Sequence, residues 1–127
     1  MPTQLTLRQL APSLKIDGGI VTLTLADFEK LARLAAERMV VDEKWYLERY
    51  PDVKAAIGRK ELFFAAEHFR RHGFIEGRAS SAQTVDPSWY IATYPDVDAA
   101  IRAGHFKSAQ EHFDLAGLNE GRLPHKV

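Results

Sequence analysis

Residues 41–78 read VDEKWYLERYPDVKAAIGRKELFFAAEHFRRHGFIEGR, and residues 85–122 read VDPSWYIATYPDVDAAIRAGHFKSAQEHFDLAGLNEGR. The two stretches align at an offset of 44 residues without a gap, and 19 of the 38 paired positions are identical. The shared frame is VD-x-x-WY, then YPDV-x-AAI, then EHF-x-x-x-G-x-x-EGR. A fixed period of this kind indicates an internal duplication, so the chain contains two copies of one structural unit.

Each copy predicts three short helices. Asp42 and Asp86 are suited to cap the first helix, and Pro87 fits its first position. Pro51 and Pro95, in the YPDV motif, are suited to open the second helix. Helices this short are not stable alone, so packing within and between the copies must hold them. With two copies, we favour a closed pair related by an approximate twofold axis over an open array.

The third helix of each copy carries the EHF motif. We expect it to end at Gly73 or Gly117, in a left-handed C-cap. In the second copy, Ser108 with Glu111 forms an S-x-x-E capping box. Helical spacing predicts that these side chains face inward: Phe64, Ala65, His68 and Phe69 in the first copy, and Ala109, His112 and Phe113 in the second.

Residues 1–40 lie outside the repeat and predict a β-hairpin followed by a helix. A Gly18-Gly19 turn would pair Ile16 with Val21, and Leu14 with Leu23, on one face. Thr24 with Asp27 resembles a capping box that opens a helix ending at about Met39. Its apolar stripe consists of Phe28, Leu31, Ala32, Ala35 and Met39. Residues 5–12 fit either a strand or a short helix stopped by Pro12.

The predicted fold is therefore mainly α: two tandem three-helix repeats preceded by a hairpin and a helix. The domains are 1–40, a cap or dimerisation element; 41–84, the first repeat; and 85–127, the second repeat. An isolated two-stranded hairpin is marginal in water. One hypothesis is that the edge of the hairpin pairs with a second copy of the chain and makes a homodimer.

The composition is that of a folded, neutral chain. The 127 residues include 17 basic and 17 acidic side chains, and 46% are hydrophobic. Zero net charge gives no global attraction to nucleic acid. No apolar run approaches the roughly 18 residues needed for a membrane span, and no secretory signal precedes the repeats. We expect a cytoplasmic protein. The absence of cysteine excludes disulfides but does not fix the compartment.

The frame WYL-x-x-YPDV-x-AAI…EHF-x-x-x-G-x-x-EGR resembles a short repeat of bacterial surface-polysaccharide glycosyltransferases and of some large secreted proteins. The matching residues of the first copy are Trp45, Tyr46, Pro51, Asp52, Val53, His68, Phe69, Gly73, Glu76, Gly77 and Arg78. Their second-copy partners match as well, and Pro124 completes an EGR-x-P motif. In those proteins the repeat is an accessory module beside the catalytic domain. The resemblance implies an accessory role and carries over no assigned chemistry, and we expect no cofactor.

Four repeated positions are candidate binding residues: Trp45, Tyr46, His68 and Arg78, with Trp89, Tyr90, His112 and Arg122. The Trp-Tyr pairs could stack on sugar rings, and the arginines could bind an anion. Alternatively, one aromatic residue of each pair lies in the core, the Trp being favoured. The histidines would then hold the third helix to a loop or a Tyr hydroxyl. The arginines would pair with Asp52, with Asp96 or with the glutamate of EGR. We favour these structural roles, because duplication preserves folding residues at least as readily as sites.

Two further features of the first copy have plain interpretations. His68 and His72 share a helix face and could hold a metal ion, but no third ligand is in view and the second copy has Ala116 instead. No metal site is therefore predicted. The basic cluster of Arg59, Lys60, Arg70 and Arg71 is interpreted as a solvated face.

No catalytic motif is found. We therefore expect a non-catalytic accessory or adaptor protein that binds another protein, which the resemblance places in bacterial surface-polysaccharide metabolism. The alternative is a small carbohydrate-binding module that uses the repeated Trp-Tyr and Arg positions. An enzyme would need a site built between the copies around His68, His112, Glu67 and Glu111.

Overall fold

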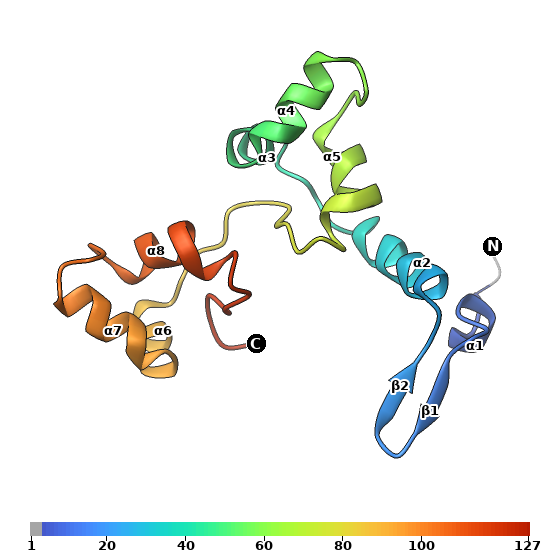
Figure 1. The fold of residues 1–127 in the computed structure, drawn as a ribbon, viewed down its shortest axis with the longest axis horizontal. Helices are drawn as coiled ribbons and strands as arrows, with labels where there is room; N and C mark the ends of the chain where they lie inside the picture. The colour runs from blue at the N-terminus through green and yellow to red at the C-terminus, as the bar shows by residue number, and fades with distance from the viewer. Residues whose placement is uncertain (1–3) are drawn as a thin grey trace. The chain divides into compact units, whose positions relative to one another are not determined.

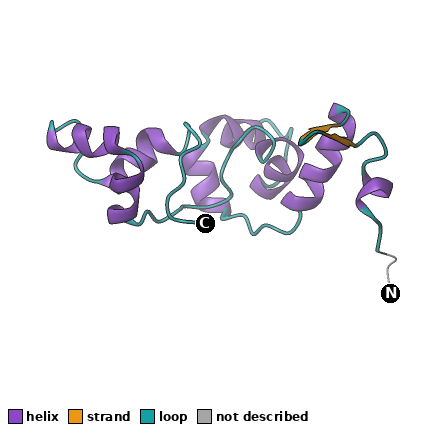
Figure 2. Ribbon diagram, turned by 90° about the horizontal axis from the view of Figure 1, so that it is seen from below, coloured by secondary structure: helices purple, strands orange, loops and turns teal. Residues whose placement is uncertain are grey.

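The computed structural model describes residues 4–127, which divide into two compact units between Ser80 and Ser81 (Figure 1). The first unit contains α1 (Leu7–Leu10), β1 (Lys15–Asp17), β2 (Ile20–Thr22), α2 (Leu25–Ala36), α3 (Glu43–Arg49), α4 (Pro51–Gly58), α5 (Ala65–His68) and the π-helix η1 (Phe69–Gly73). The second contains α6 (Pro87–Thr93), α7 (Pro95–Arg102), α8 (Ala109–His112) and the π-helix η2 (Phe113–Gly117). Within the described residues, strand is confined to the hairpin (Figure 2). The mainly α fold and the three helices of each copy are confirmed.

Local signals start the first two helices of each repeat as predicted. The Asp42 carboxylate accepts a hydrogen bond from the backbone N–H of Trp45 at 3.1 Å. Asp86 accepts one from the N–H of Trp89 at 3.3 Å. The proline of each YPDV motif is the first residue of α4 or α7. Proline suits this position because the first helical N–H has no partner within the helix.

The third helix begins differently in the two copies. In the second copy the Ser108 hydroxyl accepts from the N–H of Glu111 at 3.1 Å, as predicted. The Glu111 carboxylate accepts from the N–H of Lys107 rather than of Ser108, so the box is not reciprocal. In the first copy Glu43, on α3, caps the first two N–H groups of α5 at 2.7 and 3.0 Å. This cap joins two helices.

The third helix ends at Gly73 and at Gly117, as predicted, but the predicted left-handed C-cap at these glycines is wrong. Each glycine is the last residue of its π-helix, and neither has a positive φ. The left-handed residues are Gly77, with φ 86°, and Gly121, with φ 76°. The chain therefore makes a further turn before it leaves the helix.

The hairpin has the predicted register. Ile16 pairs with Val21 across a Gly18-Gly19 turn, and both glycines have positive φ, as a type I′ turn requires. At the base of the same face, Leu14 is buried, whereas Ile16 and Val21 are 62% and 54% exposed. The apolar face of the hairpin thus runs from a buried base to an uncovered tip.

The flanking helices differ in part from the prediction. Residues 7–10 form a helix, opened by a reciprocal capping box of Thr6 and Gln9. Thr24 caps α2, but the Asp27 carboxylate accepts from the backbone N–H and the hydroxyl of Ser13 instead of completing a box. The helix α2 ends at Ala36, its one fully buried residue, rather than near residue 39.

The apolar stripe predicted on α2 is only partly covered. Leu31 and Ala32 are half-buried, while Phe28, Ala35 and Met39 are exposed. Apolar surface therefore remains accessible along α2.

None of the helices among residues 4–127 combines the length and the apolar character that crossing a membrane requires.

Each unit has its own hydrophobic core. The first cluster is formed by Ala36, Tyr46, Val53, Ala65 and Phe69. The second is formed by Val85, Tyr90, Val97, Ala109 and Phe113. The tyrosine of each Trp-Tyr pair, not the favoured tryptophan, is the fully buried one, and Trp45 and Trp89 pack half-buried against the clusters. The inward placement predicted for Phe64 is wrong, since its side chain is 64% exposed.

Candidate functional site

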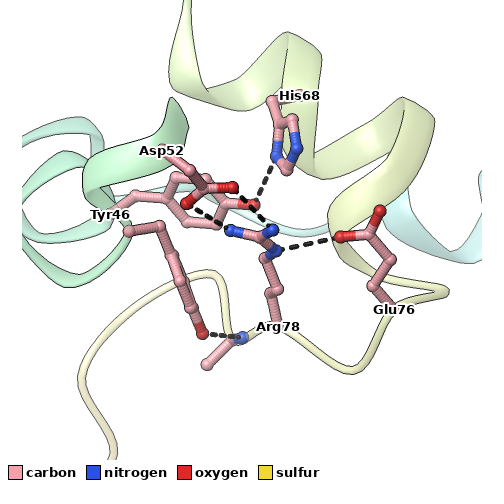
Figure 3. A network of polar contacts seen from close by, with 7 residues as sticks. Tyr46, Asp52, His68, Glu76 and Arg78 are labelled. Atoms are coloured by element: carbon pink, nitrogen blue, oxygen red, sulfur yellow. Dashed lines mark hydrogen bonds and ion pairs between the residues drawn. The ribbon is translucent and has the colours of Figure 1, made fainter. Parts of the chain in front are cut away.

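A buried tyrosine–histidine pair connects the helices of the first repeat (Figure 3). The Tyr46 hydroxyl, from α3, lies 2.8 Å from Nδ1 of His68, on α5. A Cβ atom at Gly73 would lie 2.3 Å from that hydroxyl oxygen. Only glycine leaves room for the hydroxyl, so the Gly73 position, the phenol and the imidazole form one packing unit.

Burial keeps both members of this pair uncharged. Loss of solvent raises the pKa of the Tyr46 phenol far above its usual range, although the nearby Arg78 charge opposes the shift. Loss of solvent also lowers the pKa of His68, and here the Arg78 charge adds to the effect. At neutral pH the phenol is protonated and the imidazole is neutral. The pair therefore holds the core together without carrying a charge.

The EGR motif forms a helix C-cap of the Schellman type. The N–H of Arg78 donates to the carbonyl of Gly73 at 2.9 Å, and the N–H of Gly77 donates to that of Phe74 at 3.0 Å. Gly77 supplies the left-handed residue that this motif needs. The glycine of EGR thus directs the chain out of the helix, and the arginine follows it directly.

The guanidinium of Arg78 fastens this exit to α4. It donates two hydrogen bonds to the Asp52 carboxylate, at 2.9 and 2.8 Å, and one to Glu76 at 2.9 Å (Figure 3). It also lies over the Tyr50 ring, 4.9 Å from the centroid, while the Tyr50 hydroxyl accepts from the N–H of Ala79 at 3.0 Å. These hydrogen bonds raise the pKa of Arg78 and lower that of Asp52.

The second repeat builds the same network. The Tyr90 hydroxyl lies 2.8 Å from Nδ1 of His112. Arg122 donates to Asp96 at 2.9 and 2.7 Å and to Glu120 at 2.6 Å. Burial raises the pKa of Tyr90, and the hydrogen bonds from Arg122 lower that of Asp96. A network formed twice at equivalent positions is explained by the folding of the repeat.

The predicted site residues are thus engaged within their own repeats. The tyrosines and histidines are buried, and both arginines form ion pairs. The hydrogen bonds expected for the structural interpretation are present in both copies. Trp45 and Trp89 are half-buried, each edge-on to the tyrosine of YPDV at 6.1 or 6.2 Å between centroids. The tryptophans alone retain an accessible part of a large aromatic ring.

A different set of side chains surrounds open space in the first unit. A groove of about 870 Å³ and a smaller hollow of about 250 Å³ share four lining residues. These are Arg33 of α2 and Arg70, Arg71 and His72 of η1. The sequence shows the Arg70-Arg71 pair as a basic cluster of the first copy. It does not show Arg33, because the approach of that residue depends on the packing of α2 against η1.

The histidine pair has no metal-binding geometry around it. Within residues 4–127, no three His, Asp or Glu side chains gather in a way that could hold a metal ion. The rings of His68 and His72 lie 5.8 Å apart between centroids, and Nδ1 of His68 is engaged by Tyr46.

The chain matches no protein-family model, no curated protein and no solved structure.

Proposed function

We propose that the protein is a non-catalytic accessory or adaptor protein that binds another protein through its first unit. The supporting observation is the uneven distribution of exposed apolar side chains. Among the described residues, thirteen of the sixteen exposed large hydrophobic side chains belong to the first unit. The greater length of that unit, 77 described residues against 47, does not account for this excess. Concentrated apolar exposure is typical of protein interaction surfaces.

The hairpin and the start of α2 contribute a group of these side chains. We define the hairpin surface as Ile16, Val21, Leu25 and Phe28, of which the least exposed, Phe28, is still 48% exposed. In the part of the chain that the structure describes, β1 and β2 pair only with each other. Each strand therefore has an outer edge with free backbone groups. An extended apolar segment of a partner could add to such an edge, with its side chains against the hairpin surface.

The alternative function, a small carbohydrate-binding module, has less support. The rings of Tyr46 and Tyr90 are fully buried and have no face for a sugar. A sugar platform would rest on Trp45 and Trp89, each of which already packs against its core.

For the adaptor proposal, the resemblance of the repeats to accessory modules suggests a partner in bacterial surface-polysaccharide metabolism, acting in the cytoplasm.

Paired surface variants test the adaptor proposal. The tagged full-length chain is used to co-purify proteins from the lysate of its host, next to an Ile16→Lys/Val21→Lys variant and a Leu115→Lys/Leu123→Lys control. All four side chains are exposed, so both variants should keep the circular dichroism of the parent. We expect the hairpin variant to co-purify at least about tenfold less of the partner than the parent does, because two charges would face an apolar contact. Equal capture by the two variants would contradict the proposal.

The homodimer hypothesis has a separate test. Light scattering at tens of micromolar should show a dimer if a second copy occupies the hairpin edge, and the Ile16→Lys/Val21→Lys variant should then be monomeric. A monomeric parent chain would end that hypothesis and leave the adaptor proposal intact.

A further inference from the structure

We infer that the first unit binds a phosphate monoester at Arg33, Arg70, Arg71 and His72. These four side chains form the wall shared by the groove and the smaller hollow. Arg33 comes from α2, outside the repeat, and the other three come from η1. This site is independent of the adaptor proposal, because it uses none of the residues of the hairpin surface.

The second repeat shows that this basic wall is not required for folding. Its residues at the positions of Arg70, Arg71 and His72 are Asp114, Leu115 and Ala116. The π-helix, the tyrosine–histidine bond and the Schellman cap nevertheless form there in the same way. The folding of the repeat therefore does not explain why three cationic or titratable side chains stand together in the first copy.

The guanidinium groups of this wall are short of counter-charges. Among residues 4–127, the side chains of Arg33 and Arg70 have no ion-pair or hydrogen-bond partner. Arg71 has one contact, at 3.4 Å to Glu67, between partly exposed groups one helical turn apart. Such a pair contributes little to stability. Arg33 and Arg70 are thus available to an anion, and Arg71 is held only by this weak pair.

The charge of the smaller hollow indicates which anion fits. Three arginines and one carboxylate, Glu29, line it, and the charges of these four groups sum to +2. A phosphate monoester carries about −1.5 to −2 at pH 7, whereas a carboxylate carries a single negative charge. Arginine also binds phosphate through two parallel N–H donors. A phosphate group therefore matches this hollow better than a carboxylate does.

The carboxylates of the larger groove direct the phosphate to the smaller hollow. Glu43 caps α5, and Glu67 faces Arg71, while Glu37 also lines the groove. These three carboxylates repel an anion on that side, although only Glu67 is paired with an arginine of the wall. An anion therefore gains most from the arginines in the smaller hollow, where Glu29 is the one carboxylate.

Apolar side chains beside the arginines fit the organic part of an ester. Ala32, Phe74 and Ile75 line the smaller hollow, and Phe64 and Ala66 line the groove. Phe64 is 64% exposed, so its side chain is accessible to an apolar or aromatic group. The groove has the volume of small-molecule sites, which is roughly 300–1,000 Å³. The ligand class is thus a phosphate monoester of a small apolar or aromatic alcohol.

Calorimetric titration of the full-length chain with phenyl phosphate tests the inference. We expect saturable binding, at least about tenfold tighter than that of benzoate, because benzoate has one charge and fewer acceptor oxygens. Inorganic phosphate should bind more weakly than phenyl phosphate, since it lacks the ring. Absence of saturable binding, or equal affinity for phenyl phosphate and benzoate, would overturn the inference. Equal affinity for inorganic phosphate would overturn the part assigned to the apolar side chains.

Charge-matched variants separate a site from a general charge effect. Arg33→Gln/Arg70→Gln removes two positive charges from the wall, and Lys44→Gln/Lys54→Gln removes two from exposed positions on α3 and α4. We expect the first variant to weaken phenyl phosphate binding by at least about tenfold and the second by less than about twofold. A third variant, Arg70→Asp/Arg71→Leu/His72→Ala, carries the residues of the second copy and should remain folded without binding. An equal loss of affinity in the two charge-matched variants would show that the site does not exist.

Discussion

At the scale of single residues, the absence of a side chain at Gly73 is as important as the hydroxyl of Tyr46. A Cβ atom at Gly73 would meet that oxygen at 2.3 Å, while the next nearest atoms, on His68 and Phe69, lie at 3.5 Å. The hydroxyl is thus the one close obstacle to a larger residue. The same hydroxyl hydrogen-bonds the buried imidazole of His68. Its removal would relieve one constraint and leave a polar nitrogen without its partner.

These contacts predict a rescue between two destabilising substitutions. Gly73→Ala should lower the free energy of unfolding by about 3 kcal/mol through overpacking. Tyr46→Phe should lower it by about 1–3 kcal/mol, because His68 loses a buried hydrogen bond. The double variant should be more stable than the sum of the two losses predicts, since the alanine methyl group takes the place of the hydroxyl. Urea denaturation of all four proteins measures this coupling.

The second repeat provides the control for that rescue. A Cβ atom at Gly117 would again lie 2.3 Å from a tyrosine hydroxyl, that of Tyr90, but it would also lie 3.2 Å from an atom of the Phe113 ring. Tyr90→Phe should therefore rescue Gly117→Ala less completely. Strictly additive losses in the first repeat would show that the hydroxyl is not what excludes a side chain.

The buried state of His68 predicts a loss of stability in mild acid. Burial lowers the pKa of His68 in the folded protein below its unfolded value, near 6.5. The unfolded chain then binds more protons than the folded chain, so the free energy of unfolding decreases as the pH falls below about 6.5 and is fully retained above it. Asp52 and Asp96, whose pKa values are lowered by arginine, add a further loss only in stronger acid.

Urea denaturation at pH 8 and pH 5.5 checks this prediction. The parent chain should be less stable at pH 5.5, and His68→Gln, which cannot titrate, should show a smaller difference between the two conditions. The comparison is made within each protein, so a uniform loss of stability in the variant does not affect it. An unchanged difference in the variant would exclude His68 as its source.

At the scale of elements, the turn after the second helix distinguishes the two copies. Lys60 follows α4 with a φ of 62°, and its counterpart Gly104 follows α7 with a φ of 84°. A left-handed conformation costs a residue with a Cβ atom roughly 1–2 kcal/mol. Glycine avoids that cost but loses about 0.5–1 kcal/mol through the greater freedom of the unfolded chain. The first copy therefore carries local strain that the second avoids.

Exchanging the two residues tests this difference. Lys60→Gly should raise the free energy of unfolding by about 0.5–1 kcal/mol, and Gly104→Lys should lower it by a similar amount. A side chain at position 104 meets no atom within 4 Å, so backbone strain alone sets the sign. Chemical denaturation of both variants gives the measurement. A lower stability of Lys60→Gly would contradict the explanation.

The elements that local rules specify are those that the sequence predicts well. The caps at Asp42 and Asp86, the prolines of YPDV and the Gly18-Gly19 turn depend on neighbouring residues, and the structure confirms them. The choice of tyrosine over tryptophan for the core depends on which ring reaches the histidine of another helix. The wall that includes Arg33 likewise depends on tertiary packing. Hydrophobic periodicity gives neither the approach of Tyr46 to His68 nor that of Arg33 to Arg70 and Arg71.

The C-terminal turn of each third helix is an intermediate case. Its signal in the sequence is the glycine of EGR, four residues after Gly73. Gly73 and Gly77 are both candidates for the left-handed cap, and Gly73 is the one predicted from the sequence. The π-helix ends at Gly73, where a Cβ atom would meet the Tyr46 hydroxyl, and the chain makes one further turn beyond it. Gly77 is then left to take the cap.

At the scale of the whole molecule, the chain has two cores rather than one. The two buried clusters share no residue, and Ala36 of α2 belongs to the first. The N-terminal elements therefore add to the first repeat, where the basic wall and most exposed apolar side chains also occur. Duplication supplied two equivalent scaffolds, and the features without a folding role are concentrated on one of them. The second repeat thus serves as an internal reference for the first.

Separate cores predict separate responses to core substitutions. Val53 and Val97 occupy equivalent positions and are 1% and 0% exposed. Replacing either with alanine should cost about 2 kcal/mol. Hydrogen exchange followed by mass spectrometry should show faster exchange within residues 41–80 for Val53→Ala and within residues 85–127 for Val97→Ala. A segment exchanges through local opening, and the free energy of that opening depends on the core that the segment packs against. If either variant accelerated exchange equally in both repeats, the units would unfold as one, and two independent cores would be the wrong description.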